Sequence, residues 1–335
     1  MSEPGRDALI ARFLARNGYD AGAAAPLAQD ASFRRYLRLK PSGTKPGAVL
    51  MDAPPPEDVR PFLAMAAHLS NAGLSVPAIL GADADNGLVL EEDLGDSLYS
   101  AVLTGANAHA LLDAAIDALA VMQRAAPPPG LPTWGAPEMR ETALGTLFDW
   151  WWPAIHGAPA PPAAREAVAA GLTDMLVHVE QGPRCLVHRD YFAGNLLWLA
   201  DRQGHERAGI IDFQGAAIGH PAYDLASLLQ DARRDMPEAW EGHALARYLA
   251  ARPELDAGAF LSAYTACAAQ RHLRVACQWV RLAVRDNRPA YLAHGPRTWA
   301  LLTRALAEPA AAPLAAALDA WAPRSHRRNP PGLRP

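Results

Sequence analysis

One stretch of this chain, residues 185–212, alternates three short apolar runs with turn-forming residues, and it constrains the fold more than any other part of the sequence. Short apolar runs separated by polar, glycine-containing turns are typical of β-strands joined in hairpins. The second and third runs, residues 196–199 and 209–211, therefore predict an antiparallel hairpin. Asn195 precedes the first of these strands and Asp212 follows the second, so the hairpin places both side chains at the same end.

Oxygen-bearing side chains gathered in this way suit the chemistry of phosphoryl transfer. That reaction needs metal ions to neutralise charge on the phosphates and a carboxylate to orient and deprotonate the attacking hydroxyl. Mg²⁺ takes oxygen ligands and usually binds through one or two carboxylates together with substrate phosphates. Asn195 and Asp212 are therefore the predicted Mg²⁺ ligands, and Asp190, on the loop before the hairpin, is the predicted catalytic base.

The spacing of these residues resembles that of the kinases. His188, Asp190 and Asn195 match the catalytic-loop pattern His-x-Asp-x-x-x-x-Asn. Asp212 and Phe213 stand where kinases carry the metal-binding Asp-Phe-Gly. A lone His-x-Asp occurs by chance in many proteins, but the full set in this order on these predicted elements is far harder to obtain by chance.

The segment that follows narrows the resemblance and also contains a departure from it. Gln214 replaces the glycine of Asp-Phe-Gly, while HPAYDLASLL at residues 220–229 is similar to the corresponding segment of the aminoglycoside phosphotransferase and choline kinase superfamily. The resemblance implies ATP and Mg²⁺ as cofactors. It also implies that Asp224 is a structural residue that braces the catalytic loop.

This superfamily implies an α+β, protein-kinase-like bilobal fold. We expect a small N-lobe with an antiparallel sheet and a helix at residues 1–92, and a larger, mainly helical C-lobe at residues 93–322. Residues 323–335 are rich in Pro and Arg without periodicity, which predicts a disordered tail.

The expected N-lobe carries the nucleotide in such a fold. The first hairpin tip, with Ser32, Phe33 and Arg34, is the candidate cover for the nucleotide phosphates, although it lacks the Gly-rich kinase pattern. Glu92 and Leu94 lie where the superfamily has the hinge whose backbone contacts adenine.

The lysine that pairs with nucleotide phosphates in kinases is missing from its expected strand. Met51 and Asp52 stand near the end of that strand. Either Arg34, Arg35 or Arg38 takes the phosphate role, or the nucleotide is held in another way, and the sequence leaves these alternatives open.

Several further segments resemble one subfamily, the bacterial kinases that phosphorylate N-acetylmuramate and N-acetylglucosamine at the anomeric hydroxyl in peptidoglycan recycling. They are ASFRRY at residues 31–36, MDAPP at 51–55, HRDY at 188–191, IDFQ at 211–214, QRHLR at 270–274 and RDNRPAYL at 285–292. Residues 192–194, Phe-Ala-Gly, depart from the more polar triplet expected of many relatives.

An amino sugar is therefore the expected acceptor, and four residues are candidates for contacting it. Arg271 and Arg274 can clamp the lactyl carboxylate of N-acetylmuramate bidentately. Trp151, one of three consecutive tryptophans that cannot all point inward on one helix, offers an indole face for the sugar ring, and Tyr191 adjoins the base.

Composition excludes several other classes. A net charge of −4 and a pI near 6.3 argue against nucleic acid as the main partner. The three cysteines form no Cys-x-x-Cys and suggest neither a disulfide framework nor a zinc site. No signal peptide or membrane-spanning stretch is recognisable, so we expect a cytoplasmic protein without a membrane partner; nothing in the sequence fixes its oligomeric state.

Two alternatives remain at this point. The missing lysine favours a catalytically weak pseudokinase that serves as a binding module, while intact Asp190, Asn195 and Asp212 argue against it. An aminoglycoside- or choline-type phosphotransferase is the other alternative. Cationic acceptors need an acidic pocket, whereas residues 271–288 are rich in Arg.

Overall fold

The computed structural model describes residues 4–27, 34–41 and 43–335. They form two compact units: Met1–Val102 together with Asn195–Gln214, and Leu103–Gly194 together with Gly215–Pro335. The first unit thus extends past the expected boundary at residue 92. It also takes in the hairpin, which the sequence had assigned to the C-lobe.

The first unit is built on a five-stranded sheet in the order β1-β2-β3-β5-β4, in which all neighbouring strands are antiparallel. The strands are β1 (Ala24–Pro26), β2 (Arg35–Leu39), β3 (Ala48–Asp52), β4 (Ile79–Asp83) and β5 (Leu88–Glu92). The β4–β5 turn contains the predicted Asn86-Gly87, and Gly87 has φ 64°, which a hairpin turn of this kind requires.

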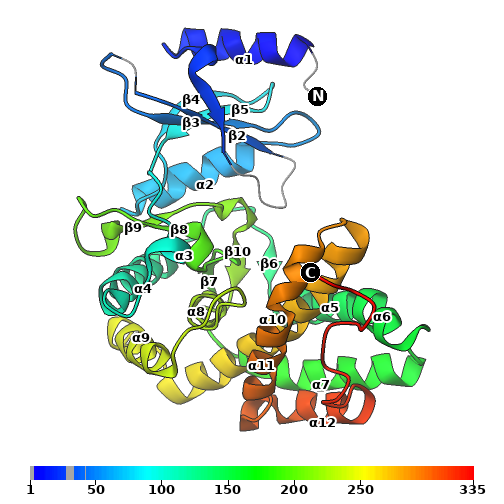
Figure 1. Cartoon of the computed structure of the whole chain (residues 1–335). Helices are drawn as coiled ribbons and strands as arrows, with labels where there is room; N and C mark the ends of the chain where they lie inside the picture. The colour runs from blue at the N-terminus through cyan, green and yellow to red at the C-terminus, as the bar shows by residue number, and fades with distance from the viewer. Residues whose placement is uncertain (1–3, 28–33, 42) are drawn as a thin grey trace. The chain divides into compact units, whose positions relative to one another are not determined.

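Two helices cover this sheet, α1 (Pro4–Arg16) on one face and α2 (Arg60–Asn71) on the other (Figure 1). On the α1 side, a buried apolar cluster joins the helix to alternate residues of the strands: Ile10, Phe13, Leu14, Tyr19, Leu39, Ala48, Leu50, Leu88 and Leu90. Because successive strand residues point to opposite faces, Tyr36, Met51 and Glu91 lie on the α2 side.

The hairpin predicted from the sequence is present in the first unit. Strand β8 (Leu196–Trp198) pairs antiparallel with β9 (Ala208–Ile210), with Leu196 opposite Ile210. Isolated bridges from Ser75 to Gly209 and from Leu98 to Leu197 attach the hairpin to the segments that flank the sheet strands, the second of which continues into α3 (Tyr99–Val102).

The second unit is mainly helical (Figure 1). Its helices are α4 (Ala108–Arg124), α5 (Ala136–Thr146), α6 (Trp152–His156), α7 (Pro162–Glu180), α8 (Ala222–Leu229), α9 (Glu238–Ala251), α10 (Ala257–Arg285), α11 (Gly295–Ala305) and α12 (Ala312–Trp321). A small sheet has the order β6-β10-β7, with β6 (Thr133–Trp134), β7 (Cys185–Val187) and β10 (Ala217–Gly219).

The long helix α10 organises the second unit, because α5, α7, α8 and α11 all pack against it. The carboxylate of Asp256 caps its N-terminus by accepting a hydrogen bond from Ala259 N–H at 2.7 Å. The helix is consequently buried over much of its length, and it brings Arg271 into the interior of the unit while Arg274 is half-buried.

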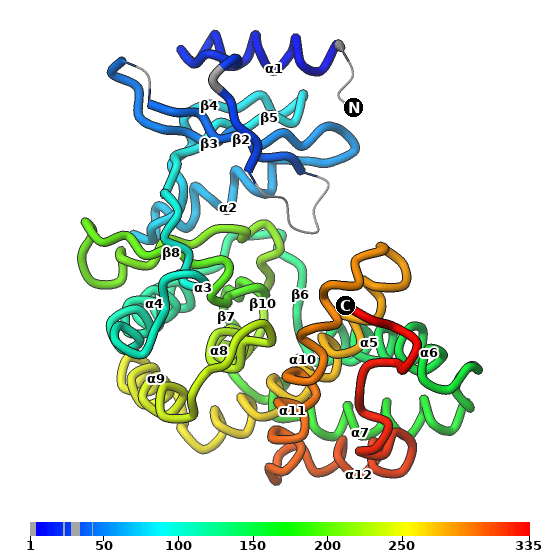
Figure 2. The backbone as a smooth tube through the Cα atoms, viewed as in Figure 1, coloured from blue at the N-terminus to red at the C-terminus, as the bar shows by residue number. Residues whose placement is uncertain are grey.

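The chain after α12 makes contacts with distant segments, which the prediction of a disordered tail at residues 323–335 does not include. The indole N–H of Trp151 donates to the carbonyl of Arg328 at 2.9 Å, and the amide of Asn329 donates to the carbonyl of Leu292 at 2.7 Å (the tail is red in Figure 2). The Arg327 side chain is buried and paired with Asp319. Composition could not reveal these long-range contacts.

Candidate active site

The structure places the two predicted metal ligands side by side in the first unit. Asn195 directly precedes β8, and Asp212 is the second residue after β9. The N–H of Ile211, which lies between β9 and Asp212, donates to the Asn195 carbonyl at 3.1 Å. The Asn195 side-chain amide lies 3.3 Å from Asp212 Oδ2. The predicted geometry of the hairpin is therefore confirmed, with both oxygen-bearing side chains at one end.

The backbone at Asp212 has an unusual conformation for a non-glycine residue, with φ 64°. Residues in the left-handed region cluster at functional sites, where the surroundings hold them against the conformational cost. Two contacts hold this turn: Gln214 donates its side-chain amide to Asp212 Oδ1 at 2.6 Å, and Phe213 stacks on Phe62 of α2 with ring centroids 4.9 Å apart. Gln214, the departure from Asp-Phe-Gly, thus orients the carboxylate that the sequence predicts to bind a metal ion.

One carboxylate and one amide oxygen fit Mg²⁺ but do not form a complete cage. In residues 4–27, 34–41 and 43–335, no cluster of three or more His, Cys, Asp and Glu residues is suited to hold a metal ion. Mg²⁺ usually keeps several waters and completes its octahedron with substrate phosphates. The exposed Asp212 and half-buried Asn195 therefore suit a Mg²⁺ ion that arrives with a nucleotide.

One buried carboxylate, that of Asp224, holds the loop that carries the predicted base Asp190. Asp224 of α8 is fully buried and accepts hydrogen bonds from the backbone N–H groups of His188, at 2.6 Å, and Arg189, at 2.9 Å. Burial raises the pKa of Asp224 to about 6, against the opposing effect of His188 and of these two hydrogen bonds. Asp224 therefore has the bracing role that the sequence suggested.

Arg189 gives the loop a second unusual backbone conformation, with φ 73°. Its guanidinium lies over the Trp134 ring, 4.1 Å from the ring centroid, and donates to the Gly215 carbonyl at 3.2 Å. Asp190, the next residue, donates its backbone N–H to His188 Nδ1 at 3.3 Å and is exposed. The strained residue beside it turns the predicted base out of the core.

Two arginines of α10 lie in the electrostatic neighbourhood of Asp190. Arg274 donates to the Tyr223 hydroxyl at 3.1 Å and to Gln278 Oε1 at 2.9 Å. Arg271 is only 3% exposed, and within the described part of the chain its Nε and Nη1 atoms have no hydrogen-bond partner. Burial lowers the pKa of Arg271, and the charge of Arg274 lowers it further, while Asp190 raises it.

The other two candidates for sugar contact, Trp151 and Tyr191, are buried in this structure, which argues against that role for them. The Trp151 side chain is fully buried against Trp299 and the C-terminal segment. A π-helical turn, Leu147–Trp151, inserts an extra residue into the helix and allows Trp151 and Trp152 both to point inward. Tyr191 is also fully buried, with its hydroxyl donating to the Ala115 carbonyl at 2.7 Å. Neither ring has a face available for a sugar.

The sequence analysis missed residues that support this loop from elsewhere in the chain. Trp134 packs against the Arg189 guanidinium and edge-on against Tyr223, and Arg233 lies 4.3 Å from the centroid of Phe192. The sequence signal that could have indicated this role is that Trp134 lies in a Pro-rich segment between helices. The stacking on Phe192 also accounts for an apolar residue in the unexpected Phe-Ala-Gly triplet.

Only some of the residues predicted to contact the nucleotide lie in the described part of the chain. Ser32 and Phe33 lie outside the described residues. Glu92 pairs with Arg202 at 3.0 Å and also accepts the Ala78 N–H, so its side chain braces the end of β5. Leu94 is half-buried after the strand ends.

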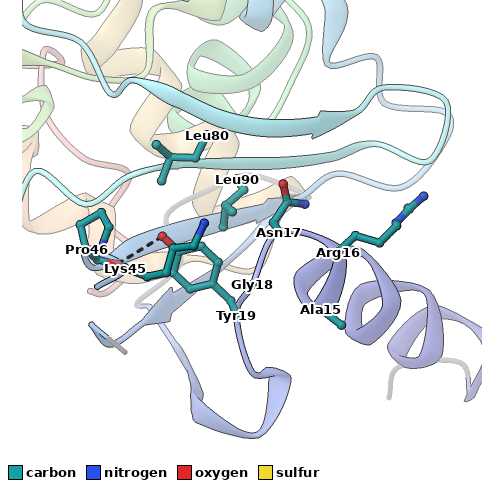
Figure 3. Close-up of a pocket in the computed structure, with 9 residues that line it drawn as sticks. All are labelled: Ala15, Arg16, Asn17, Gly18, Tyr19, Lys45, Pro46, Leu80 and Leu90. Atoms are coloured by element: carbon teal, nitrogen blue, oxygen red, sulfur yellow. Dashed lines mark hydrogen bonds between the residues drawn. The ribbon is translucent and has the colours of Figure 1, made fainter. Parts of the chain in front are cut away.

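A hollow of about 440 Å³ in the first unit holds none of the predicted site residues (Figure 3). Arg16, Asn17, Tyr19 and Lys45 line it together with Leu90, and the Tyr19 hydroxyl donates to the Pro46 carbonyl at 3.2 Å. Leu90 belongs to the apolar cluster under α1. The hollow is therefore on the opposite side of the sheet from Tyr36 and Glu91.

In the described part of the chain, none of the helices combines the length and the apolar character needed to cross a membrane.

The comparisons with known proteins define the class. The model of the phosphotransferase enzyme family matches residues 23–261. Two solved structures share the fold: a choline/ethanolamine kinase family protein from Mesorhizobium loti, with TM-score 0.61 and 16% identity over 94% of this chain and 98% of that one, and an ADP-bound aminoglycoside phosphotransferase, with TM-score 0.60 and 14% identity over 91% and 99%. The predicted α+β, protein-kinase-like fold is confirmed.

Closer relatives lie within this class. The N-acetylmuramate/N-acetylglucosamine kinase of Caulobacter vibrioides is 37% identical over 96% of this chain and 98% of its own length. The enzyme of the same name from Pseudomonas aeruginosa is 37% identical over 84% of this chain and 83% of its own. The chain belongs to the phosphotransferase enzyme family, and membership implies that it is a kinase that uses ATP.

Proposed function

We propose that this protein transfers the γ-phosphoryl group of ATP to the anomeric hydroxyl of N-acetylmuramate and N-acetylglucosamine, giving sugar 1-phosphates for peptidoglycan recycling. The observation that carries the proposal is the 37% identity, over nearly the whole of both chains, to a kinase named for these two sugars. We place the reaction in the cytoplasm, where ATP and Mg²⁺ are available.

Asp190 is the general base in this proposal. The anomeric hydroxyl is more acidic than an ordinary alcohol, so a carboxylate suffices to accept its proton as the new oxygen–phosphorus bond forms and ADP departs. The exposed position of Asp190 and its support by His188, Arg189 and Asp224 suit a group that orients a substrate hydroxyl. Positioning of this kind supplies much of the rate in phosphoryl transfer.

Asn195 and Asp212 are the proposed Mg²⁺ ligands. The bound ion would neutralise charge on the phosphates. Gln214 keeps the Asp212 carboxylate oriented through the 2.6 Å hydrogen bond to Oδ1, which leaves Oδ2 on the side of Asn195. The polypeptide's contribution is thus a fixed pair of oxygen ligands at the end of a hairpin.

Arg271 and Arg274 are proposed to select an anionic or strongly polar acceptor. Arg274 is held by Tyr223 and Gln278, so Arg271 is the arginine better placed to donate to a lactyl carboxylate. Charge-assisted hydrogen bonds to a carboxylate are strong. The buried guanidinium of Arg271 and the half-buried one of Arg274 near Asp190 also disfavour the cationic acceptors of an aminoglycoside- or choline-type enzyme.

A coupled assay of ADP release tests the function directly. The purified protein is supplied with ATP and Mg²⁺ and with N-acetylmuramate, N-acetylglucosamine, choline or kanamycin in separate reactions. We expect turnover with both amino sugars. Turnover with choline or kanamycin alone would replace the sugar assignment, and absence of turnover with all four would favour a pseudokinase.

A further inference from the structure

Helix α10 carries a row of polar residues, four of them arginines, along one face. Residues that are three and four positions apart lie on the same side of an α-helix. This spacing relates the members of the row, which are Arg271, Arg274, Gln278, Arg281 and Arg285. The α10 row begins near the proposed base, because the charge of Asp190 acts on both Arg271 and Arg274.

The α10 row leads from the interior of the second unit to its surface. Along the row, Arg271 is buried, Arg274 and Arg281 are half-buried, and Arg285 is exposed. The residues on the other sides of the same stretch of helix are buried: Val275, Ala276, Cys277, Trp279, Val280 and Leu282. A chain attached to a sugar beside Arg271 could therefore reach solvent along this row.

Three of the four arginines have buried nitrogen atoms whose hydrogen-bonding capacity is not used. In the part of the chain that the structure describes, Arg271 Nε and Nη1, Arg274 Nε and Arg281 Nε have no hydrogen-bond partner. Buried polar atoms are nearly always paired in native proteins, so each exception calls for an explanation. A ligand that supplies acceptor oxygens along the row is one that explains all three arginines together.

The charges around Arg281 are mostly positive. Burial lowers the pKa of Arg281, the charges of Arg285 and Arg274 lower it further, and Asp286 opposes them. Asp286 already accepts hydrogen bonds from Arg285, from Nε at 2.7 Å and from Nη2 at 3.0 Å. Because a guanidinium stays charged in a protein, an anionic group of a ligand beside Arg281 would offset this repulsion.

The anionic group beside Arg281 cannot be the lactyl carboxylate that we propose for Arg271. An α-helix rises about 1.5 Å per residue, so Arg281 lies about 15 Å beyond Arg271 along the helix axis. A second anionic group, joined to the sugar by a longer chain, is needed. The lactyl group can carry such a chain, because its carboxyl group forms an amide with a peptide and the amide oxygen still accepts a hydrogen bond from Arg271.

We infer that the α10 row is an extension of the acceptor site, and that Arg281 binds a carboxylate of a short acidic peptide joined to the lactyl group of N-acetylmuramate. The inference rests on the proposed function. It widens the class of ligands that the acceptor site takes from amino sugars alone to amino sugars that carry an acidic peptide.

Two synthetic ligands that differ in charge test the inference by calorimetric titration. One is N-acetylmuramyl-L-alanyl-D-glutamate, and the other is its diamide, in which both glutamate carboxyl groups are converted to amides. We expect wild-type protein to bind the acidic ligand about 10- to 100-fold more tightly, as for a charged hydrogen bond. Arg281→Gln should lose most of this preference with a much smaller change for the diamide, and Arg281→Lys should keep most of it.

Arg247→Gln is the charge-matched control, since it also removes one positive charge from the second unit. Arg247 lies on α9 and pairs with Asp117 at 2.6 Å and with Asp113 at 3.3 Å. This variant should keep the wild-type preference. Wild-type protein without a preference for the acidic ligand, including protein that binds neither ligand, would overturn the inference. A preference that survives in Arg281→Gln, or an equal loss in Arg247→Gln, would overturn it as well.

The two proposals fail in different ways. Wild-type protein that turns over N-acetylmuramate but shows no preference for the acidic ligand would refute only the role of Arg281. Wild-type protein that makes no sugar phosphate would refute the proposed function, while the comparison of Arg281→Gln with Arg247→Gln would still decide whether Arg281 binds the acidic ligand.

Discussion

Replacing Asp224 by Asn separates the effect of the buried charge on stability from its effect on the loop that carries Asp190. The change keeps the shape of the side chain and removes its charge. The carboxylate accepts hydrogen bonds from the N–H groups of His188 and Arg189, and Arg189 keeps a left-handed backbone conformation beside Asp190, the proposed base. An amide has one acceptor oxygen and turns a donor toward one of those N–H groups. We therefore expect the loop to relax and Asp190 to move.

The expected effect on stability is small, because two opposing contributions are similar in size. Burial raises the pKa of Asp224 from 3.8 to about 6, so at pH 7 the ionised group costs the folded state roughly 3 kcal/mol, at about 1.4 kcal/mol per pKa unit. Asn removes that cost but leaves one buried N–H unpaired, which costs about 1–3 kcal/mol. The free energy of unfolding should therefore change by less than about 2 kcal/mol.

The expected effect on catalysis is large by comparison. A displacement of a catalytic group by about 1 Å costs on the order of 100-fold in rate, so Asp224→Asn should lower kcat by about that factor. The coupled ADP-release assay measures kcat, and thermal unfolding measures stability. Asp174→Asn, an exposed position on α7, is the control and should change neither. A kcat close to that of the wild type in Asp224→Asn would refute the bracing role.

Asp224 also predicts how the activity and the stability of the wild type depend on pH. The two dependences have opposite signs. As the pH falls through about 6, Asp224 takes up a proton and loses the charge that holds the loop, so kcat should fall. Because the folded-state pKa is raised, this group favours folding most below about pH 4, and that contribution is lost as the pH rises through about 6. Asp224→Asn should remove both dependences.

Three further substitutions test individual roles. Asp190→Asn should lower kcat by about 10²- to 10⁴-fold with much smaller changes in sugar KM and ATP binding, and intact kcat with lost ATP affinity would make Asp190 a nucleotide or metal ligand instead. Asp212→Ala should abolish turnover and Mg²⁺-dependent nucleotide binding, with Asn195→Ala weakening both; near-wild-type activity in Asp212→Ala would refute the metal assignment. Arg271→Gln should raise KM for N-acetylmuramate by about 10- to 100-fold and leave KM for N-acetylglucosamine nearly unchanged. Equal effects on the two sugars would exclude a contact to the lactyl carboxylate.

The hairpin that carries the proposed metal ligands could be predicted because its signals are local. Apolar runs and a turn fix which residue opposes which, so Asn195 and Asp212 follow from the sequence once β8 and β9 pair. The same holds for Asn86-Gly87 between β4 and β5. A short-range sequence pattern is sufficient to predict strand pairing wherever strands adjacent in the chain pair with each other.

The features that the sequence could not provide depend on contacts between distant segments. The burial of Trp151 needs a π-helical turn and the returning C-terminal segment, and helical periodicity contains neither. The carboxylates that pair with Arg34, Arg35 and Arg38 belong to segments that the fold brings beside each guanidinium. Ion-pair partners 17 to 58 residues apart leave no trace in local composition.

The most direct test of the central claim is the position of the transferred phosphate. Wild-type protein is incubated with ATP, Mg²⁺ and N-acetylmuramate or N-acetylglucosamine, and the product is examined by ³¹P NMR. We predict a phosphomonoester whose phosphorus couples to the anomeric proton of the sugar, and no such signal with Asp190→Asn on the same timescale. Phosphate on the 6-hydroxyl would contradict the proposed anomeric chemistry while leaving the kinase assignment intact.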